Sequence, residues 1–477
     1  MTLRFPDGEL GTWACLSDVT DRAVRIWLRA PEAGPRSARL LIDGKVVARA
    51  ELTPLPEHDW VAADDIVLDR PVPNARFSLE VAGIVRHGRL GPTPGTPATF
   101  SFAFASCHQP FKRTLRGRLA THAGIRLYPS MARVLREHDA RFVNLVGDQV
   151  YSDGVEPLNL GRAAARRDLP PSERTLLEWY RRVYRGYFNQ RGFRALLEEW
   201  PTHMIWDDHD IIEGWGSLLR PTELDHRLFR AASTAYREYQ HVRTFGADVD
   251  AAPPYHYCFW FGDVGFFVLD LRGERDYRAG RVIGERQWGD LDDFLRTAAH
   301  RGVPTVFVIA SVPLVHLPPT FDHLLEWVPT ARGTDVRDRW AVWPSRDQRD
   351  RLLERLFTWQ DPDARRQAIL LSGDVHAGAA FEISRPGLPG LVAQWTSSPL
   401  TTRTGPRHHL VNRIGTALAN AGEATYRFER KALELSNNFG LVRVQPLSGG
   451  GHRAEFTLYG LPTGARDVRP RARVVRA

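Results

Sequence analysis

The sequence predicts an α/β domain that is preceded by a small all-β sandwich. Up to residue 98, several runs alternate apolar and polar residues, as strands with one buried face do. From residue 99 onward, short apolar runs are followed by polar turns and then by stretches with helical spacing, which is typical of α/β folds. We therefore expect a sandwich domain over 1–98, an α/β domain over 99–462 and a mobile basic tail over 463–477.

The expected sandwich rests on three strand-like runs. They read AVRIWLRA (23–30), ARLLIDGKVVARAEL (38–52) and ARFSLEVAGIVRHGRL (75–90). Asp43-Gly44 divides the second run and predicts a tight hairpin turn, since both residue types tolerate a left-handed backbone. The stretch GPTPGTP (91–97) then predicts a linker, because proline and glycine interrupt regular structure.

The expected α/β domain contains six buried strands with helices between them. The strands lie in FSFAFASCHQ, ARFVNLVGDQVY, PTHMIWDDHD, VGFFVLDLRGER, TVFVIASVPLV and AILLSGDVHAGA. Helical spacing occurs in SMARVLREHD, GERQWGDLDDFLRTAAH and SRDQRDRLLERLFTWQ, and the arginine-rich region 161–200 predicts a helical cover. Near the end, FGLVRVQPL and HRAEFTLYGL return to the alternation of strands.

Composition excludes several classes of protein. The chain has 477 residues, 43% hydrophobic and 25% charged, and no run approaches the ~18 apolar residues of a membrane span. The net charge is +8, but no block of five or six basic residues occurs, so charge does not indicate a stable nucleic-acid partner. Three scattered cysteines and a start, MTLRFPDGELG, without an export signal lead us to expect a cytoplasmic protein.

Polar clusters follow five of the expected strands. They are Ser106-Cys107-His108, Gly147-Asp148-Gln149-Val150-Tyr151, Asp207-Asp208-His209-Asp210, Asp270 to Arg275, and Gly373-Asp374-Val375-His376. Each cluster alone has an ordinary structural explanation, such as a turn, a core residue or an ion pair. Ligands bind outside the carboxyl ends of strands in α/β sheets, however, and carboxylates buried together without a cation are costly. The combination predicts a metal centre.

The side chains offered by these clusters are of mixed character, which favours two neighbouring metal sites. Cys107, Asp148, Tyr151 and His376 would suit iron. Asp208 and Asp374, with Asp148 as a shared bridge, would suit a harder divalent ion such as calcium, manganese or magnesium. Paired metals of this kind hydrolyse phosphoesters.

The motifs ASCHQ, LVGDQVYSDG, WDDHDI, VLDLRGERD, LLSGDVHAG and WTSSPLT occur in this order. In them the chain resembles the PhoD-type alkaline phosphatases of the calcineurin-like metallophosphoesterase superfamily. GDQVY is also similar to the aspartate and iron-binding tyrosine of purple acid phosphatases. The resemblance implies two packed sheets covered by helices, an α+β four-layer sandwich, and it suggests iron plus calcium as cofactors.

The resemblance also implies roles for individual residues. Cys107 and Tyr151 match the family's iron-binding cysteine and tyrosine, and Asp148 matches its bridging aspartate. Asp208 matches a metal-ligand asparagine of the superfamily, and Asp374 and His376 match its last motif. His209 matches a histidine that contacts phosphate or protonates the leaving group, and Arg272, in a pattern shared with Arg275, is assigned to phosphate contact. Asp207, Asp210 and Asp270 are expected to orient these groups. Asp210 stands where family members usually have glutamate.

The predicted function is hydrolysis of phosphate monoesters, diesters or both by attack of a metal-bound hydroxide at a centre of two or more metals. The substrate would be a small phosphoester or a phospholipid-type molecule. A phospholipase D-like phosphodiesterase is an alternative within the same chemistry. From a different class, a catalytically silent protein that binds a ligand through its β-sandwich is the other alternative. The oligomeric state is not predicted by any feature of the sequence.

Overall fold

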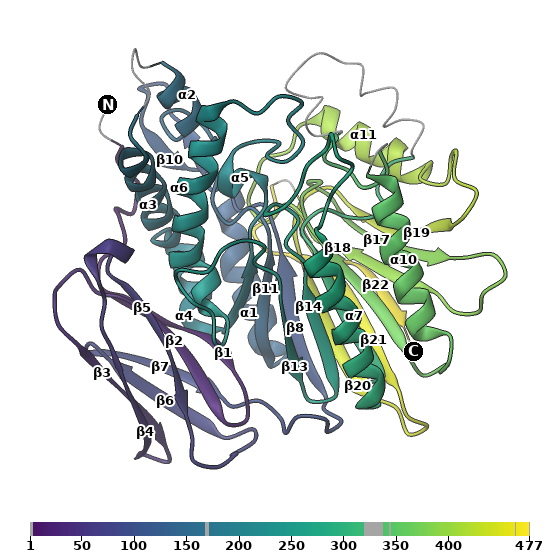
Figure 1. Cartoon of the computed structure of the whole chain (residues 1–477), viewed down its shortest axis with the longest axis horizontal. Coiled ribbons are helices and arrows are strands. Elements are labelled where there is room, and N and C mark those ends of the chain that lie inside the picture. The colour runs from purple at the N-terminus through teal and green to yellow at the C-terminus, as the bar shows by residue number, and fades with distance from the viewer. Residues whose placement is uncertain (1–2, 167–170, 319–336, 343–344, 463, 477) are drawn as a thin grey trace.

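The computed structural model describes residues 3–166, 171–318, 337–342, 345–462 and 464–476. An all-β region comes first in the chain, as the sequence predicts, and lies at the lower left of Figure 1. Its strands are β1 (Trp13–Val19), β2 (Ala23–Arg29), β3 (Arg36–Ile42), β4 (Lys45–Leu52), β5 (Val61–Val67), β6 (Arg76–Val81) and β7 (Ile84–Arg89), with a 3-10 turn η1 (Pro56–His58). They form two antiparallel sheets, β1-β2-β5 and β4-β3-β6-β7.

Inward-facing residues of both sheets, such as Val24, Ile26, Leu40 and Leu79, make one apolar core between the sheets. Asp43 and Gly44 both have positive φ, 49° and 73°, at the turn between β3 and β4. The predicted all-β sandwich and its hairpin turn are therefore confirmed.

The rest of the chain is built on two larger mixed sheets. The six-stranded sheet has the order β12-β11-β8-β20-β21-β22, and the seven-stranded sheet has the order β13-β14-β15-β16-β18-β17-β19. The first sheet comprises β8 (Phe100–Ala105), β11 (Ala140–Val146), β12 (Thr202–Ile205), β20 (Asn437–Pro446), β21 (His452–Leu461) and β22 (Arg469–Arg476). The second comprises β13 (Tyr257–Phe261), β14 (Val264–Val268), β15 (Thr305–Ala310), β16 (Gln367–Ser372), β17 (Gly378–Ser384), β18 (Val392–Thr396) and β19 (Arg427–Glu434).

An aromatic core joins the two sheets face to face. Phe102 on β8 lies 5.1 Å from Phe142 on β11 and 5.2 and 5.4 Å, ring centre to ring centre, from Phe307 and Phe266 of the facing sheet. Rings of this size bury much apolar surface, and edge-to-face pairs add specificity to it. This arrangement holds the carboxyl ends of strands from both sheets beside one another.

Helices cover the sheets and connect their strands (Figure 1). They are α1 (Leu127–Glu137), α2 (Leu160–Ala165), α3 (Glu173–Phe188), α4 (Arg191–Glu199), α5 (Asp208–Ile211), α6 (Glu223–Tyr239), α7 (Glu285–His300), α10 (Arg346–Gln360) and α11 (Pro406–Ala417), with 3-10 turns η2 (Ala123–Arg126) and η3 (His241–Arg243). A small hairpin, β9 (Phe111–Arg113) and β10 (Leu119–Thr121), lies apart from the large sheets. The predicted helical cover over 161–200 corresponds to α2, α3 and α4.

The expected mobile tail needs correction. Residues Arg469–Arg476 form β22, which pairs antiparallel with β21 at the edge of the six-stranded sheet. Arg471 Nε donates to Glu434 Oε2 at 2.5 Å, and Val474 packs against the core. Ladder hydrogen bonds and alternate partly buried positions order a basic segment that composition alone marks as a tail. The domain boundaries at 98/99 and 462/463 stay predictions.

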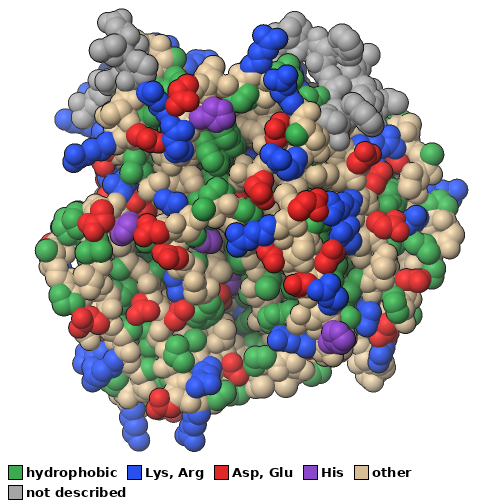
Figure 2. Space-filling view, in the orientation of Figure 1, with side chains coloured by type: hydrophobic (Ala, Val, Ile, Leu, Met, Phe, Trp, Pro, Cys, Tyr) green, Lys and Arg blue, Asp and Glu red, His purple; other side chains and the backbone are tan. Residues whose placement is uncertain are grey.

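On the face shown in Figure 2, basic and acidic side chains are interspersed, and no large patch of basic side chains is visible among the described residues. No helix in the described part of the chain combines the length and apolarity that a membrane span requires.

Candidate metal centre

Four strand ends bring the predicted metal-binding residues to one edge of the molecule. β8 and β12 both pair in parallel with β11, so their carboxyl ends point the same way. β16 belongs to the parallel part of the facing sheet. Cys107, Asp148, Asp208 and Asp374 follow β8, β11, β12 and β16, respectively. Residues separated by as many as 267 positions thus come into contact.

One side of this cluster combines a thiol, a phenol and an imidazole around one carboxylate. Cys107 Sγ donates to Asp148 Oδ2 at 3.3 Å, and the Tyr151 hydroxyl donates to the same oxygen at 3.2 Å. The Tyr151 oxygen lies 3.5 Å from His376 Nε2. The four residues that the sequence assigns to an iron site are therefore neighbours, and Asp148 is in contact with both Cys107 and Tyr151.

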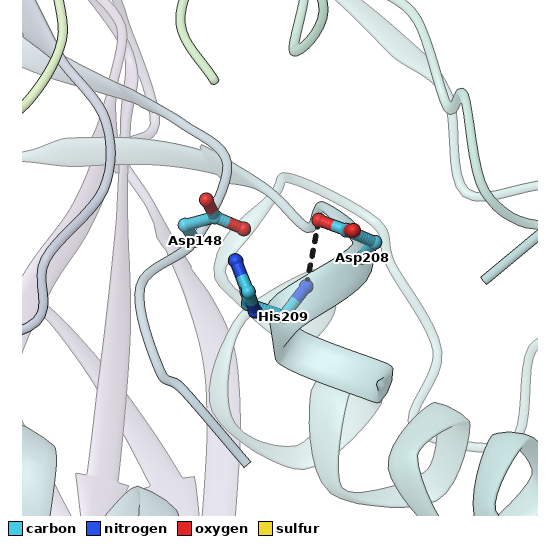
Figure 3. A group of neighbouring side chains, drawn as sticks. All are labelled: Asp148, Asp208 and His209. Atoms are coloured by element: carbon cyan, nitrogen blue, oxygen red, sulfur yellow. Dashed lines mark hydrogen bonds between the residues drawn. The ribbon is translucent and has the colours of Figure 1, made fainter. Parts of the chain in front are cut away.

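The other side of the cluster is acidic. Asp148, Asp207, Asp208 and Asp374 each offer a carboxylate oxygen, and these oxygens all lie within 4.8 Å of one another. Asp148, Asp208 and His209 form an overlapping group by the same measure, and Figure 3 shows their side chains facing a common space. Asp148 belongs to both sides of the cluster. Asp207, which we expected only to orient its neighbours, also belongs to the acidic group.

The backbone is left-handed at four of these residues. Cys107, Asp148, Asp374 and His376 have φ of 61°, 59°, 59° and 52°, a region that non-glycine residues rarely adopt. Hydrogen bonds between the turns hold this conformation, since Cys107 N donates to Gly147 O at 3.3 Å and His108 N donates to Asp148 O at 2.8 Å. Sharp turns directly after the strands aim the side chains into the shared space, and such strained positions are concentrated at functional sites.

The acidic side chains that are buried together have raised pKa values. Burial raises the pKa of Asp208 to about 6 and, with the neighbouring carboxylates, raises the pKa of Asp148 and of Asp374 well above the usual range. Asp148 Oδ1 and Asp207 Oδ2 are buried and have no hydrogen-bond partner in the described structure. A cation would offset the repulsion between the carboxylates and satisfy these oxygens, so the residues present fit a metal centre.

His209 is held by an aspartate that we did not predict. Its Nδ1 lies 2.8 Å from Asp153 Oδ1, and its ring stacks on Tyr151 with centres 4.1 Å apart. Burial lowers the pKa of His209, but Asp153, Asp208 and Asp148 together raise it well above its ordinary value. Asp153 stands two residues after Tyr151 in QVYSDG, and this spacing is the sequence signal that marks it.

Arg272, which we expect to contact phosphate, has its donors engaged by acidic and backbone partners in the structure. The side chain is fully buried; its Nε donates to Asp207 Oδ1, and its two terminal nitrogens donate to Asp338 at 2.6 and 2.5 Å. Nη1 also donates to Trp215 O at 3.0 Å. Because these donors are engaged, Arg272 contacts a substrate only if it leaves Asp338. Asp338, whose pKa falls below its usual range through Arg272 and Arg275 despite burial, was not predicted.

Asp210 and Asp270 lie where supporting residues are expected. Asp210 Oδ2 accepts from the backbone N–H of Asp148 and of Asp207, both at 2.9 Å, so it ties the turn after β11 to the turn after β12. Asp270 Oδ1 accepts from the backbone N–H of Arg272 and of Gly273, both at 2.9 Å. These contacts fix the backbone that carries the cluster.

Two hydroxyls, one from the motif WTSSPLT (395–401) and one from Thr402 directly after it, complete the thiol side of the cluster. Ser398 Oγ donates to Cys107 Sγ at 3.1 Å, and Thr402 Oγ1 donates to the Tyr151 hydroxyl at 3.2 Å. The sequence marked the motif but not these contacts, because the partners are about 250 residues or more apart.

Two packed mixed sheets with acidic, thiol and imidazole groups gathered at their carboxyl edge define a metallophosphoesterase, a phosphoric ester hydrolase. The chain belongs to the PhoD-like phosphatase family, whose model matches residues 102–446. The predicted family and the expectation of an enzyme are thereby confirmed, and the alternative of a silent binding protein is set aside.

Two solved structures share the fold. A structure of PhoD aligns with 97% of this chain and 89% of its own, at 16% identity and a TM-score of 0.71. The purple acid phosphatase PPD1 from yellow lupin (Lupinus luteus) seeds aligns over 97% of this chain and 73% of its own, at 11% identity and a TM-score of 0.57. No protein among those with curated descriptions matches the sequence.

Proposed function

We propose that this chain hydrolyses phosphate esters at two adjoining metal sites that share Asp148. The position of Asp148 carries the proposal. Its Oδ2 accepts from Cys107 and Tyr151, and its Oδ1 is buried without a hydrogen-bond partner among the described residues. Asp148 also belongs to the acidic group that includes Asp208 and Asp374. A carboxylate shared by both groups of ligands would be suited to hold two metals.

The donor sets differ in the metals they favour. Cys107, Tyr151 and His376 offer sulfur, phenol oxygen and nitrogen, which suit iron. Asp208 and Asp374 offer only carboxylate oxygen, which suits calcium, manganese or magnesium. A metal pair supplies an activated water and positive charge beside the phosphoryl oxygens.

The protein's own contribution to proton transfer lies in His209. Asp153 engages Nδ1 and thereby orients the ring, so Nε2 faces away from that contact and is the nitrogen that would donate a proton to the leaving oxygen. Stacking on Tyr151 fixes the plane of the imidazole. Arg272 acts indirectly in this proposal, because it holds Asp207 and Asp338 in place.

Metal analysis with an absorption spectrum tests the proposed sites. Purified protein should contain iron and a second metal and should absorb visible light through charge transfer from tyrosinate or thiolate. Cys107→Ser and Asp148→Asn should lose metal and lower turnover of p-nitrophenyl phosphate by more than about a hundredfold. Cys258→Ser and Asp139→Asn, at exposed positions, are matched controls and should keep both properties. Full activity in the first pair contradicts the metal assignment.

Turnover of monoester and diester substrates separates the two enzymatic alternatives. Comparison of p-nitrophenyl phosphate with bis-p-nitrophenyl phosphate shows whether the metal centre accepts a phosphate with one substituent or with two. A strong preference for the bis-ester favours the phosphodiesterase alternative.

A further inference from the structure

Helix α11 (Pro406–Ala417) and the turn after it have the reverse of the usual amphipathic pattern. The exposed fractions of Leu410, Ile414 and Leu418 are 59%, 49% and 53%. Asn412 and Thr416, in contrast, are buried with exposed fractions of 5% and 1%. A surface helix normally turns its apolar stripe to the core, so an outward apolar stripe requires another explanation.

Contacts on the inner face prevent α11 from rotating to bury its exposed apolar residues. Asn412 Nδ2 donates to Val375 O at 3.2 Å, and Asn412 Oδ1 accepts from His316 Nε2 at 2.8 Å. Thr416 Oγ1 accepts from Arg430 Nη1 at 2.6 Å. A Cβ at Gly415 would lie 2.1 Å from Leu317 Cδ2, so the glycine backbone packs directly against the Leu317 side chain. The apolar stripe faces outward because specific polar contacts hold the opposite face inward.

The charged residues in the chain segment that carries the stripe have one sign. Residues 399–422 include Arg403, Arg407 and Arg413 but no aspartate or glutamate. All three arginines are exposed, and none has an ion pair among the described residues. The next carboxylate, Glu423, has an unexposed side chain that pairs with Arg346 and Arg349. A partner for this surface is therefore apolar in part and negatively charged.

The surface adjoins the metal centre. Val375, whose carbonyl accepts from Asn412, lies between Asp374 and His376 in the chain. The rings of His376 and His408 are 6.3 Å apart. A partner docked on α11 would thus lie next to the side of the cluster that includes His376.

We propose that Leu410, Val411, Ile414 and Leu418, together with Arg407 and Arg413, dock on an anionic lipid surface and bring lipid-borne phosphoesters to the metal centre. A basic helix with an apolar stripe lies in the plane of such an interface. A single helical stripe is small beside the ~800 Å² per partner of a stable protein interface, whereas a few inserted side chains suffice at a lipid surface. The part of this inference that concerns substrate rests on the proposed function.

Vesicle flotation tests the docking. The full chain should bind vesicles of phosphatidylcholine with phosphatidylglycerol more tightly than vesicles of phosphatidylcholine alone, and added salt should weaken the binding. Leu410→Gln/Ile414→Gln should weaken binding by about tenfold or more because apolar surface no longer inserts. Arg407→Gln/Arg413→Gln should weaken binding to the anionic vesicles by about fivefold for each arginine. Glutamine keeps helix propensity, so the helix should remain folded.

Val85→Gln/Leu388→Gln serves as the matched control, because these residues are also exposed, at 46% and 36%, but lie elsewhere. It should bind vesicles as the unchanged chain does. All of these variants should hydrolyse p-nitrophenyl phosphate at an unchanged rate, since none alters the metal centre. If the unchanged chain does not hydrolyse p-nitrophenyl phosphate, the proposed function is contradicted. Vesicle binding tests the docking surface independently of that result.

Three results overturn the docking proposal. The first is equal vesicle binding by the leucine and isoleucine variant and the unchanged chain. The second is equal binding to anionic and neutral vesicles, which removes the role of the arginines. The third is failure of the unchanged chain to bind vesicles, with self-association that Leu410→Gln/Ile414→Gln abolishes, which assigns the stripe to a second copy of the chain.

Discussion

Asp153 orients His209 through a single contact. Nδ1 of the imidazole lies 2.8 Å from Asp153 Oδ1, and Asp153 Oδ2 accepts from the backbone N–H of Glu213. The aspartate thus connects the loop after β11 with the residues after α5. An oriented imidazole needs such a partner, because the hydrogen bond on one nitrogen decides which tautomer the other presents.

Asp153→Asn should therefore lower kcat by about 10²-fold with little change in KM, since proton donation to the leaving oxygen is impaired while substrate binding is kept. Steady-state kinetics with p-nitrophenyl phosphate measure this split. An ester with a more acidic leaving group should recover much of the loss, because its departure needs less protonation. A proportional fall with every leaving group would mean that Asp153 only supports the local fold. Asp139→Asn is the matched control.

The turns that follow the strands set the geometry of the centre at the scale of elements. Gly147, directly before Asp148, has φ of 106°, and a Cβ there would lie 2.8 Å from Asp207 Cβ and 3.1 Å from Ser311 Cβ. The strand β11 therefore ends at a point where the side chains of Asp207 and Ser311 approach the backbone closely. Only glycine combines this dihedral angle with this contact.

Gly147→Ala should lower the free energy of unfolding by about 2–4 kcal/mol, because strain and overlap add, and should reduce bound metal through displacement of Asp207. Urea denaturation and metal analysis measure the two effects. Gly302→Ala is the control: Gly302 has φ of 65°, but a Cβ there meets nothing within 4 Å. It should lose only about 1 kcal/mol and retain its metal. Equal losses of stability and of metal in both variants would show that the overlap of the added Cβ with Asp207 and Ser311 has no effect.

Strands and helices were predicted from the sequence better than the contacts that their side chains make. β8, β11, β12, β14, β15 and β16 were predicted, because buried parallel strands appear as continuous apolar runs. β22 was not, since its alternation is masked by arginines that face solvent. Within the site, residues directly after strands were found by position, whereas Asp338 has no local pattern and the motif around Ser398 does not reveal its contact with Cys107. Their contacts depend on tertiary packing, which one sequence does not display.

Polar contacts bind the sandwich to the larger domain and so shape the molecule as a whole. Trp27 Nε1 on β2 donates to Glu238 O on α6 at 2.8 Å, and Arg25 Nε donates to Val242 O at 2.6 Å. Both donors are buried. Loss of either contact would leave an unsatisfied polar group inside the molecule, so the two parts are expected to unfold together.

Asp59 is the charged centre of this interface. It follows η1 in the sandwich, and its Oδ1 accepts from Arg29 at 3.1 Å and from Arg185 on α3 at 2.8 Å. Oδ2 accepts from the Tyr239 hydroxyl on α6. Burial raises the pKa of Asp59, but Arg185 and Arg29 outweigh it, and the net shift is downward.

Asp59→Asn should lower the free energy of unfolding by about 3 kcal/mol at neutral pH, because it leaves two buried arginines with less negative charge while asparagine keeps the left-handed backbone of φ 53°. Since the folded pKa lies below the unfolded value of about 3.9, the carboxylate stabilises the fold fully above that pH and loses its effect as the pH falls through the folded pKa. The difference between the two proteins in urea denaturation should therefore be constant near neutrality and narrow in acid. If the difference in free energy of unfolding stays constant down to strongly acidic pH, the lost stability comes from packing. The charge of Asp59 would then not stabilise the arginines of the interface.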